Sequence, residues 1–245
     1  MSVVFRAITD SSIRDIALSP SVNNGKSFGP SFSFSNDNWM LNGCPHNGPS
    51  VVSSENATLA AWFTGGSDEG VYYGEVDSRT KTTQKKLISA SGKNIQLCLL
   101  PNGQRMMVYS EQVHAAGSVY SQIMAAKLEN GKLFSQTLTT KGAHASYPVA
   151  INFGTSKMIA AWTEMERILY RVIDAGQITT EAKQPATLAV YKTKTVSGKK
   201  LSNSNDPSCG MPLPAEVKET TFANNKVIGF CSKACKEKFL TASHP

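Results

Sequence analysis

Arginine is scarce in this sequence, and basic charge is unevenly distributed. Only six of the 25 basic residues are arginine, and none follows Arg171. Residues 181–245 hold ten lysines against five acidic residues, which is +5 of the total net charge of +7. Because arginine is the side chain that reads guanine through paired hydrogen bonds, this lysine excess makes a poor base-reading surface. We therefore expect no nucleic-acid partner and interpret the lysines as solvated.

Long apolar runs and several enzyme motifs are also missing. No stretch approaches ~18 consecutive apolar residues, so no membrane-spanning helix is expected. The first residues lack the basic and apolar regions of a signal peptide, which predicts a cytoplasmic protein; a periplasmic or secreted one is the alternative if the chain is truncated at its N-terminus. Phosphate-binding loops, dinucleotide-binding glycine motifs and nucleophile elbows are absent, so nucleotide-dependent and α/β-hydrolase chemistry have no support.

Helical periodicity is absent from the first ~190 residues, where short β-branched and aromatic runs alternate with Gly, Asn, Ser and Pro. A repeat stands out in this part. Residues 59–62 (LAAW) recur as residues 159–162 (IAAW), and residues 106–109 (MMVY) lie midway between them. Four strands per ~50 residues are typical of a β-propeller blade, in which aromatic side chains fill the interface with a neighbouring blade. We expect three to four blades over residues 1–193, with a β-sandwich as the alternative.

A degenerate hairpin motif lies near the N-terminus. Residues 21–28 (SVNNGKSF) come close to the Asp-box, Ser-x-Asp-x-Gly-x-Thr-Trp, and Phe28 in the Trp position is expected to fill a blade interface. Together with Phe5-Arg6, Arg14-Asp15 and residues 39–49 (WMLNGCPHNGP), this turn resembles bacterial sialidase-like six-bladed propellers over residues 3–175. The resemblance implies a glycoside hydrolase or a carbohydrate-binding propeller with a glycan ligand. Only about three and a half blades are visible where the family has six, so we expect a chain that is truncated, divergent, or completed by a protein partner or second subunit.

Catalytic candidates in this part are few. Sialidase chemistry needs an arginine cluster that clamps a carboxylate and a tyrosine–glutamate nucleophile pair. Arg6, Arg14 and Asp15 match the family's pattern, and Tyr170 with Glu166 is a conceivable pair. Alternate residues of a strand point to opposite faces, so Glu166 and Tyr170 could share one face, but an ordinary blade strand explains these residues better. The balance favours a protein that is not an enzyme.

Three of the five cysteines fall within the last 37 residues, as Cys209, Cys231 and Cys235. Thiolates are soft ligands suited to Zn²⁺ and Cu⁺. A helix that starts near residue 232 would bring Cys231 and Cys235 to one side, and the apolar run before Cys231 predicts a strand. A segment of about 40 residues is too short to be stabilised by a hydrophobic core alone. We expect a bound metal ion to supply the additional stability. Asp206 or His244 is a candidate fourth ligand.

Residues 206–245 resemble the YHS/TRASH family of metal-binding modules. The resemblance rests on DPSCGM at residues 206–211 and FCSKACKEKF at residues 230–239. It implies a small, treble-clef-like α+β module behind a linker at residues 194–205, with the three cysteines as ligands of zinc or copper. It further implies heavy-metal sensing, trafficking or resistance, with the propeller as scaffold or partner-binding surface. An interaction protein with structural zinc is the alternative.

Overall fold

The computed structural model describes residues 1–9, 12–54, 57–77, 83–115, 118–182, 201, 203–214, 217, 219–223 and 226–242. The chain divides into two compact units, Met1–Pro185 and Ala186–Pro245. The domain boundary predicted at residue 193 and most of the predicted linker at 194–205 lie outside the described residues. No helix in the described part of the chain is long and apolar enough to span a membrane.

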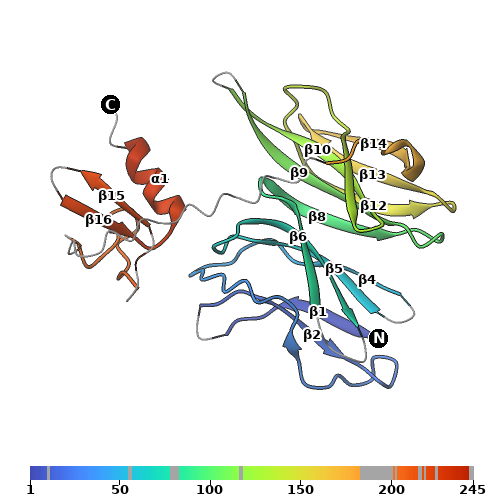
Figure 1. The fold of residues 1–245 in the computed structure, drawn as a ribbon, viewed down its shortest axis with the longest axis horizontal. Coiled ribbons are helices and arrows are strands. Elements are labelled where there is room, and N and C mark those ends of the chain that lie inside the picture. Colours follow the sequence, from blue (N-terminus) through green and yellow to red (C-terminus); the bar gives the residue numbers. More distant parts are fainter. Residues whose placement is uncertain are drawn as a thin grey trace. The chain divides into compact units, whose positions relative to one another are not determined.

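The first unit is built from four antiparallel sheets that follow one another along the chain (Figure 1). The first sheet contains β1 (Ser2–Arg6), β2 (Ile16–Pro20) and β3 (Phe32–Ser33). The second contains β4 (Ser50–Ser53), β5 (Ala57–Thr64), β6 (Gly70–Asp77) and β7 (Thr83–Ser89). The third contains β8 (Gly92–Leu99), β9 (Arg105–Ala115), β10 (Ser118–Glu129) and β11 (Lys132–Thr137). The fourth contains β12 (Ala145–Phe153), β13 (Lys157–Glu164) and β14 (Arg167–Asp174), and the 3₁₀ helix η1 (Ala175–Gln177) follows it.

The second unit is a hairpin followed by a helix. Strand β15 (Glu219–Ala223) pairs with β16 (Lys226–Phe230), and α1 spans Lys233–Ala242. Phe230 is 1% exposed and packs on Phe239 of α1, with ring centroids 5.3 Å apart. The predicted fold class is confirmed: the chain is mainly β, with successive antiparallel sheets and a small C-terminal module that contains the helix.

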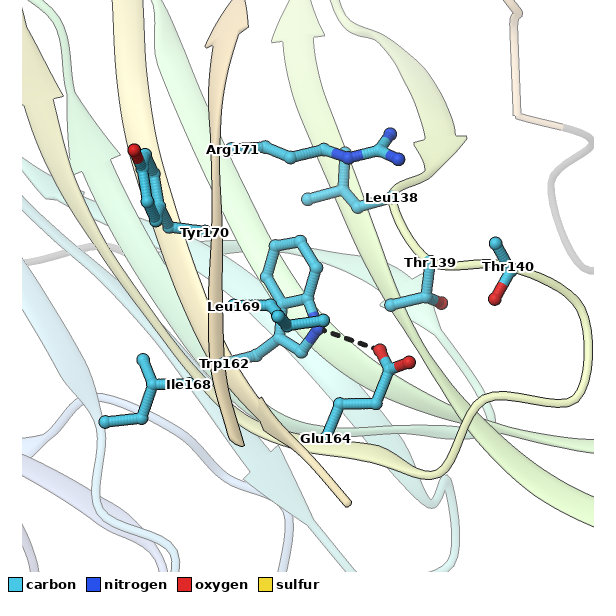
Figure 2. A pocket seen from close by; sticks show the side chains of 9 residues that line it. All are labelled: Leu138, Thr139, Thr140, Trp162, Glu164, Ile168, Leu169, Tyr170 and Arg171. Atoms are coloured by element: carbon cyan, nitrogen blue, oxygen red, sulfur yellow. Dashed lines mark hydrogen bonds between the residues drawn. The ribbon is translucent and has the colours of Figure 1, made fainter. Parts of the chain in front are cut away.

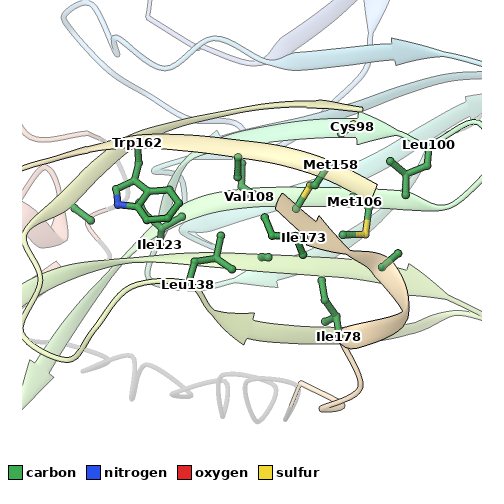
Figure 3. Close-up of a cluster of buried hydrophobic side chains, with 14 of the residues drawn as sticks. Cys98, Leu100, Met106, Val108, Ile123, Leu138, Met158, Trp162, Ile173 and Ile178 are labelled. Atoms are coloured by element: carbon green, nitrogen blue, oxygen red, sulfur yellow. The ribbon is translucent and has the colours of Figure 1, made fainter. Parts of the chain in front are cut away.

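In the second, third and fourth sheets, an aromatic residue on the second strand packs against the preceding sheet. Trp62 of β5 meets Phe34, which follows β3, edge to face with ring centroids 5.6 Å apart. Tyr109 of β9 lies in a buried cluster with residues of the second sheet, and Trp162 of β13 lies in one with residues of the third (Figure 3). Each of these sheets therefore buries one face against its predecessor, as the repeat predicts, because one blade cannot bury both faces of its sheet alone.

Small residues make room for these aromatic rings. Gly74 of β6 is paired with Ala60 of β5, and a Cβ atom at Gly74 would approach the Trp62 ring to 2.9 Å. The ring of Trp62 is completely buried, and its Nε1 donates a hydrogen bond to Asp37 Oδ2 over 2.8 Å. Close packing of this kind leaves little tolerance for a change in side-chain volume.

The Asp-box-like turn between β2 and β3 is held by its polar side chains. Ser21 Oγ accepts a hydrogen bond from the Gly25 backbone N–H at 2.8 Å, and Asn23 Oδ1 accepts one from the Ser27 N–H at 2.9 Å. Gly25 has a φ of 83°, a conformation that glycine adopts at no steric cost. Phe28, however, is 43% exposed, so the expectation that it fills an interface between blades is wrong.

Replacement of Trp62 tests the sheet–sheet contact. We expect Trp62→Ala to lower the free energy of unfolding of the first unit by about 3–5 kcal/mol, because it leaves a large cavity beside Phe34. Phe28→Ala, which removes an exposed aromatic side chain, is the matched control and should cost no more than about 1 kcal/mol. Urea unfolding followed by circular dichroism measures both. Equal losses in the two variants would contradict the role given to Trp62.

Candidate metal centre

Three cysteine side chains converge in the second unit. Cys209 lies in a turn in which the Gly210 N–H donates to the Asp206 carbonyl at 2.8 Å. Cys231 follows β16 directly, and Cys235 lies in the first turn of α1. The sulfur of Cys231 is 3.6 Å from that of Cys209 and 3.7 Å from that of Cys235. One oxygen of Asp206 joins them, so that all four potential ligand atoms lie within 4.8 Å of one another.

The sulfur separations fit a single ion. Thiolates bound tetrahedrally at about 2.3 Å from zinc lie roughly 3.8 Å apart. The observed separations of 3.6 and 3.7 Å are close to that value, whereas a disulfide needs about 2.05 Å. All three cysteines are free thiols; Cys209 is exposed, and Cys231 and Cys235 are half-buried. The cluster of Asp206 and the three cysteines can therefore hold a metal ion, with Cys209 on the solvent side.

Asp206 is the most buried member of the cluster, with 1% of its surface exposed. Its Oδ1 accepts a hydrogen bond from the Ser208 N–H at 2.7 Å, and its Oδ2 accepts one from the Cys231 N–H at 2.6 Å. Burial alone opposes ionisation, but these backbone donors outweigh it and hold the pKa of Asp206 below its ordinary value. The carboxylate thus ties the Cys209 turn to the end of β16.

The thiols of Cys231 and Cys235 are affected in the opposite sense. Burial, together with hydrogen bonding to Asp206 and to the neighbouring thiols, raises the pKa of Cys231 above its ordinary value. Burial also raises the pKa of Cys235. A bound cation would reverse this preference, because a metal ion deprotonates the thiols that coordinate it. The three sulfurs are soft donors that suit such an ion.

Two polar residues outside the predicted ligand set hold the cluster in place. Asn203 pairs with Gly229 of β16, donating to its carbonyl and accepting from its N–H, both at 2.8 Å. Ser208 Oγ donates to the Cys235 carbonyl at 2.6 Å. Sequence reasoning missed both residues; the signal was their type, because Asn and Ser readily bond to backbone groups. His244, the other predicted fourth ligand, lies outside the described residues.

In the first unit, Arg6 is occupied by backbone carbonyl groups. Its guanidinium donates to the carbonyls of Arg14 at 2.5 Å, Asn47 at 3.0 and 2.9 Å, and Phe63 at 2.8 Å. It also lies 4.8 Å from the Trp39 ring centroid. Burial lowers the pKa of Arg6 from its ordinary value, and Asp37 and Asp15 oppose that shift. Four of its five N–H groups are engaged by described residues, so Arg6 joins three segments of the chain.

The neighbouring candidates have similar structural contacts. Asp15 accepts hydrogen bonds from the backbone N–H groups of Asn38 at 3.1 Å and Trp39 at 3.3 Å. Arg14 donates to the Gly43 carbonyl at 3.5 Å, and its Nη1 is buried without a partner in the described part of the chain. The bonds of Arg6 and Asp15 thus organise the loop before β4.

Glu166 and Tyr170 do not come together. Glu166 lies with Met165 in the two-residue turn between β13 and β14, and its φ is 62°. Tyr170 lies in β14, opposite Ala161 of β13, and is 71% exposed. Four residues of extended strand separate their Cα atoms by roughly 13 Å. They therefore do not form the contact that a nucleophile pair needs.

A shallow pocket of about 300 Å³ lies beside this hairpin (Figure 2). Its one carboxylate, Glu164, accepts a hydrogen bond from Trp162 Nε1 at 3.2 Å, and Arg171 is its one arginine. A single guanidinium is no cluster, so the pocket lacks the carboxylate clamp of a sialidase. It is lined by Leu138, Thr139, Thr140, Trp162, Glu164, Ile168, Leu169, Tyr170 and Arg171.

The contacts of Arg6 predict a stability effect. We expect Arg6→Ala to lower the free energy of unfolding of the first unit by about 2 kcal/mol or more, because three carbonyl acceptors lose a charged donor. Arg14→Ala, which removes one long hydrogen bond, should cost less than about 1 kcal/mol. Thermal and urea unfolding of both variants provide the measurement. If Arg6→Ala is as stable as the native chain, the carbonyl contacts contribute nothing and the interpretation fails.

Comparisons with known proteins assign no family. No family model matches the chain, and no curated protein matches it. Among solved structures, the chain is similar to an α-L-arabinofuranosidase from Podospora anserina in complex with cellotriose. The identity is 12% and the TM-score 0.37, over 70% of this chain and 66% of that one. The chain therefore spans just under two thirds of that enzyme, and a likeness at this level carries no functional argument.

Proposed function

We propose that the second unit binds one thiophilic transition-metal ion, Zn²⁺ or Cu⁺, and that the protein acts in sensing, trafficking or resistance to such metals. The observation that carries the proposal is the convergence of Cys209, Cys231 and Cys235 from two segments, with sulfurs 3.6 and 3.7 Å apart. The likeness of residues 206–245 to YHS/TRASH modules supports the same role.

The exposure of the site favours exchange of the ion over a purely structural function. Structural zinc sites are closed by four protein ligands, whereas sites that react or exchange keep one open position. Here three thiols are supplied, and Cys209 is exposed at the edge of the cluster. Both oxygens of Asp206 already accept backbone hydrogen bonds, so the carboxylate is better placed to orient the site than to close it. A metal site with four protein ligands would favour the structural alternative instead.

The first unit is proposed as the scaffold or partner-binding surface for this module. We do not propose glycosidase activity. Arg6 and Asp15 bond to the backbone, and Glu166 and Tyr170 lie apart along one hairpin. These placements supply neither the arginine cluster nor the nucleophile pair that sialidase chemistry requires.

Metal content tests the proposal directly. We expect the native chain to carry about one zinc or copper ion, and Cys231→Ser to lose it, because Cys231 lies between the other two sulfurs. Cys44→Ser, which removes an exposed cysteine in the first unit, is the matched control and should keep its metal. Elemental analysis of protein purified without added metal, and again after dialysis against each ion, gives the ratio. Unchanged metal content in Cys231→Ser would overturn the proposal.

The role of Asp206 has its own test. Asp206→Asn should weaken zinc binding about 10- to 100-fold, because the amide cannot accept from both backbone N–H groups that the carboxylate satisfies. Competition with a chelator measures the affinity. Glu219→Gln removes a negative charge in the same unit from a residue that pairs with Lys236 and should leave the affinity unchanged. Equal affinities in the two variants would show that Asp206 does not organise the site.

A further inference from the structure

One face of the fourth sheet is apolar and has no sheet packed on it within the described part of the chain. Its large side chains on β12 and β14 are between 47% and 78% exposed. The strand register aligns Ile151, Ile159 and Val172 across the three strands, so these side chains share that face. We call this surface the open face; it consists of Val149, Ile151, Phe153, Ile159, Ala161, Ile168, Tyr170 and Val172.

The same positions are covered in the preceding sheets. Ile159 and Ala161 of β13 lie three residues and one residue before Trp162. The residues at the same distances before Trp62 in β5 and before Tyr109 in β9 are their counterparts. Those counterparts are fully buried against the following sheet; they are Leu59 and Ala61 of β5, and Met106 and Val108 of β9. The open face is therefore built like the surface on which each sheet receives its successor. Contiguous exposed apolar surface of this kind marks an interaction site.

The first sheet carries the complementary half of such a contact. Residues 2–5 of β1 (SVVF) align with residues 59–62 of β5 (LAAW), which places Phe5 in the position of Trp62. Val4 packs towards the second sheet, whereas Val3 and Phe5 on the opposite side are 42% and 36% exposed. Phe5 thus has the place of an aromatic residue that packs on a preceding sheet, with no such sheet in the described residues.

We propose that the open face binds the first sheet of a second copy of this chain, with Phe5 inserted where an aromatic of a following sheet would pack. The chain carries both halves of the contact, and the same contact joins its own sheets three times. A second copy is therefore a partner whose surface already fits. Because the two halves differ, the contact is heterologous and leads to a closed ring or to continued head-to-tail addition.

The test uses the full chain in sedimentation and light-scattering measurements, up to about 100 μM, a range that reveals weak interfaces. The expected mass is at least twice 26.4 kDa. Ile151→Asp on the open face and Phe5→Asp on the first sheet should each weaken association roughly 30-fold or more. Val119→Asp, on a 50% exposed residue of β10, introduces the same charge elsewhere and should associate like the native chain.

Mixing the variants identifies the pairing. Phe5→Asp keeps the open face and Ile151→Asp keeps Phe5, so an equimolar mixture should form a dimer with one intact contact although each variant alone is monomeric. If Phe5→Asp associates like the native chain, the open face pairs with itself and the proposal is wrong. A native chain that stays monomeric over the whole range also overturns it, whether another segment or another protein covers the face.

Two controls separate this association from other causes. Circular dichroism and urea unfolding of each variant must match the native chain, so that loss of association is not loss of fold. The mass measurement is repeated on Cys231→Ser, which tests for dimers bridged by a metal ion. Association that persists in Cys231→Ser supports the proposal, and association that disappears there contradicts it. The metal content of Ile151→Asp reports on the second unit independently.

Discussion

Aromatic packing between neighbouring sheets is the contact on which the first unit depends. Trp62 is completely buried, stacks on Tyr72 with ring centroids 6.0 Å apart and donates its indole N–H to Asp37. The ring fits because Ala60 and Gly74 leave space beside it. A four-stranded sheet has two apolar faces and cannot bury both alone, so each sheet needs a neighbour on either side. The exposed open face follows from the same constraint.

The second unit depends on a different interaction, the buried carboxylate of Asp206. Two short backbone hydrogen bonds compensate for its burial and join the Cys209 turn to the residue after β16. Cys209 and Cys231 are 22 residues apart, and this connection brings their sulfurs to 3.6 Å. Among the described side chains of this unit, Phe230 is the buried hydrophobic residue, and it packs on Phe239. A metal ion bound to the thiols would therefore contribute directly to folding.

Arg6 has a structural role in this chain. A guanidinium can clamp a substrate carboxylate or join loops, but each N–H donates only once. Four N–H groups of the Arg6 guanidinium donate to the backbone carbonyls of Arg14, Asn47 and Phe63. Asn47 and Phe63 lie 41 and 57 residues further along the chain. The motif therefore indicates where the loop before β4 is anchored. A sequence pattern does not by itself decide what its residues do.

The sequence by itself determined the local and periodic features. The spacing of Trp62, Tyr109 and Trp162 predicted the successive sheets, and the four-residue interval between Cys231 and Cys235 predicted a helix that aligns them. Both signals depend on near neighbours or on a repeat. Only the tertiary structure decided which donors of Arg6 are occupied and that Asp206 lies among the thiols. It also decided that Phe28 is exposed and that no sheet of the described residues packs on the open face. These depend on contacts between residues far apart in the chain, which no local pattern encodes.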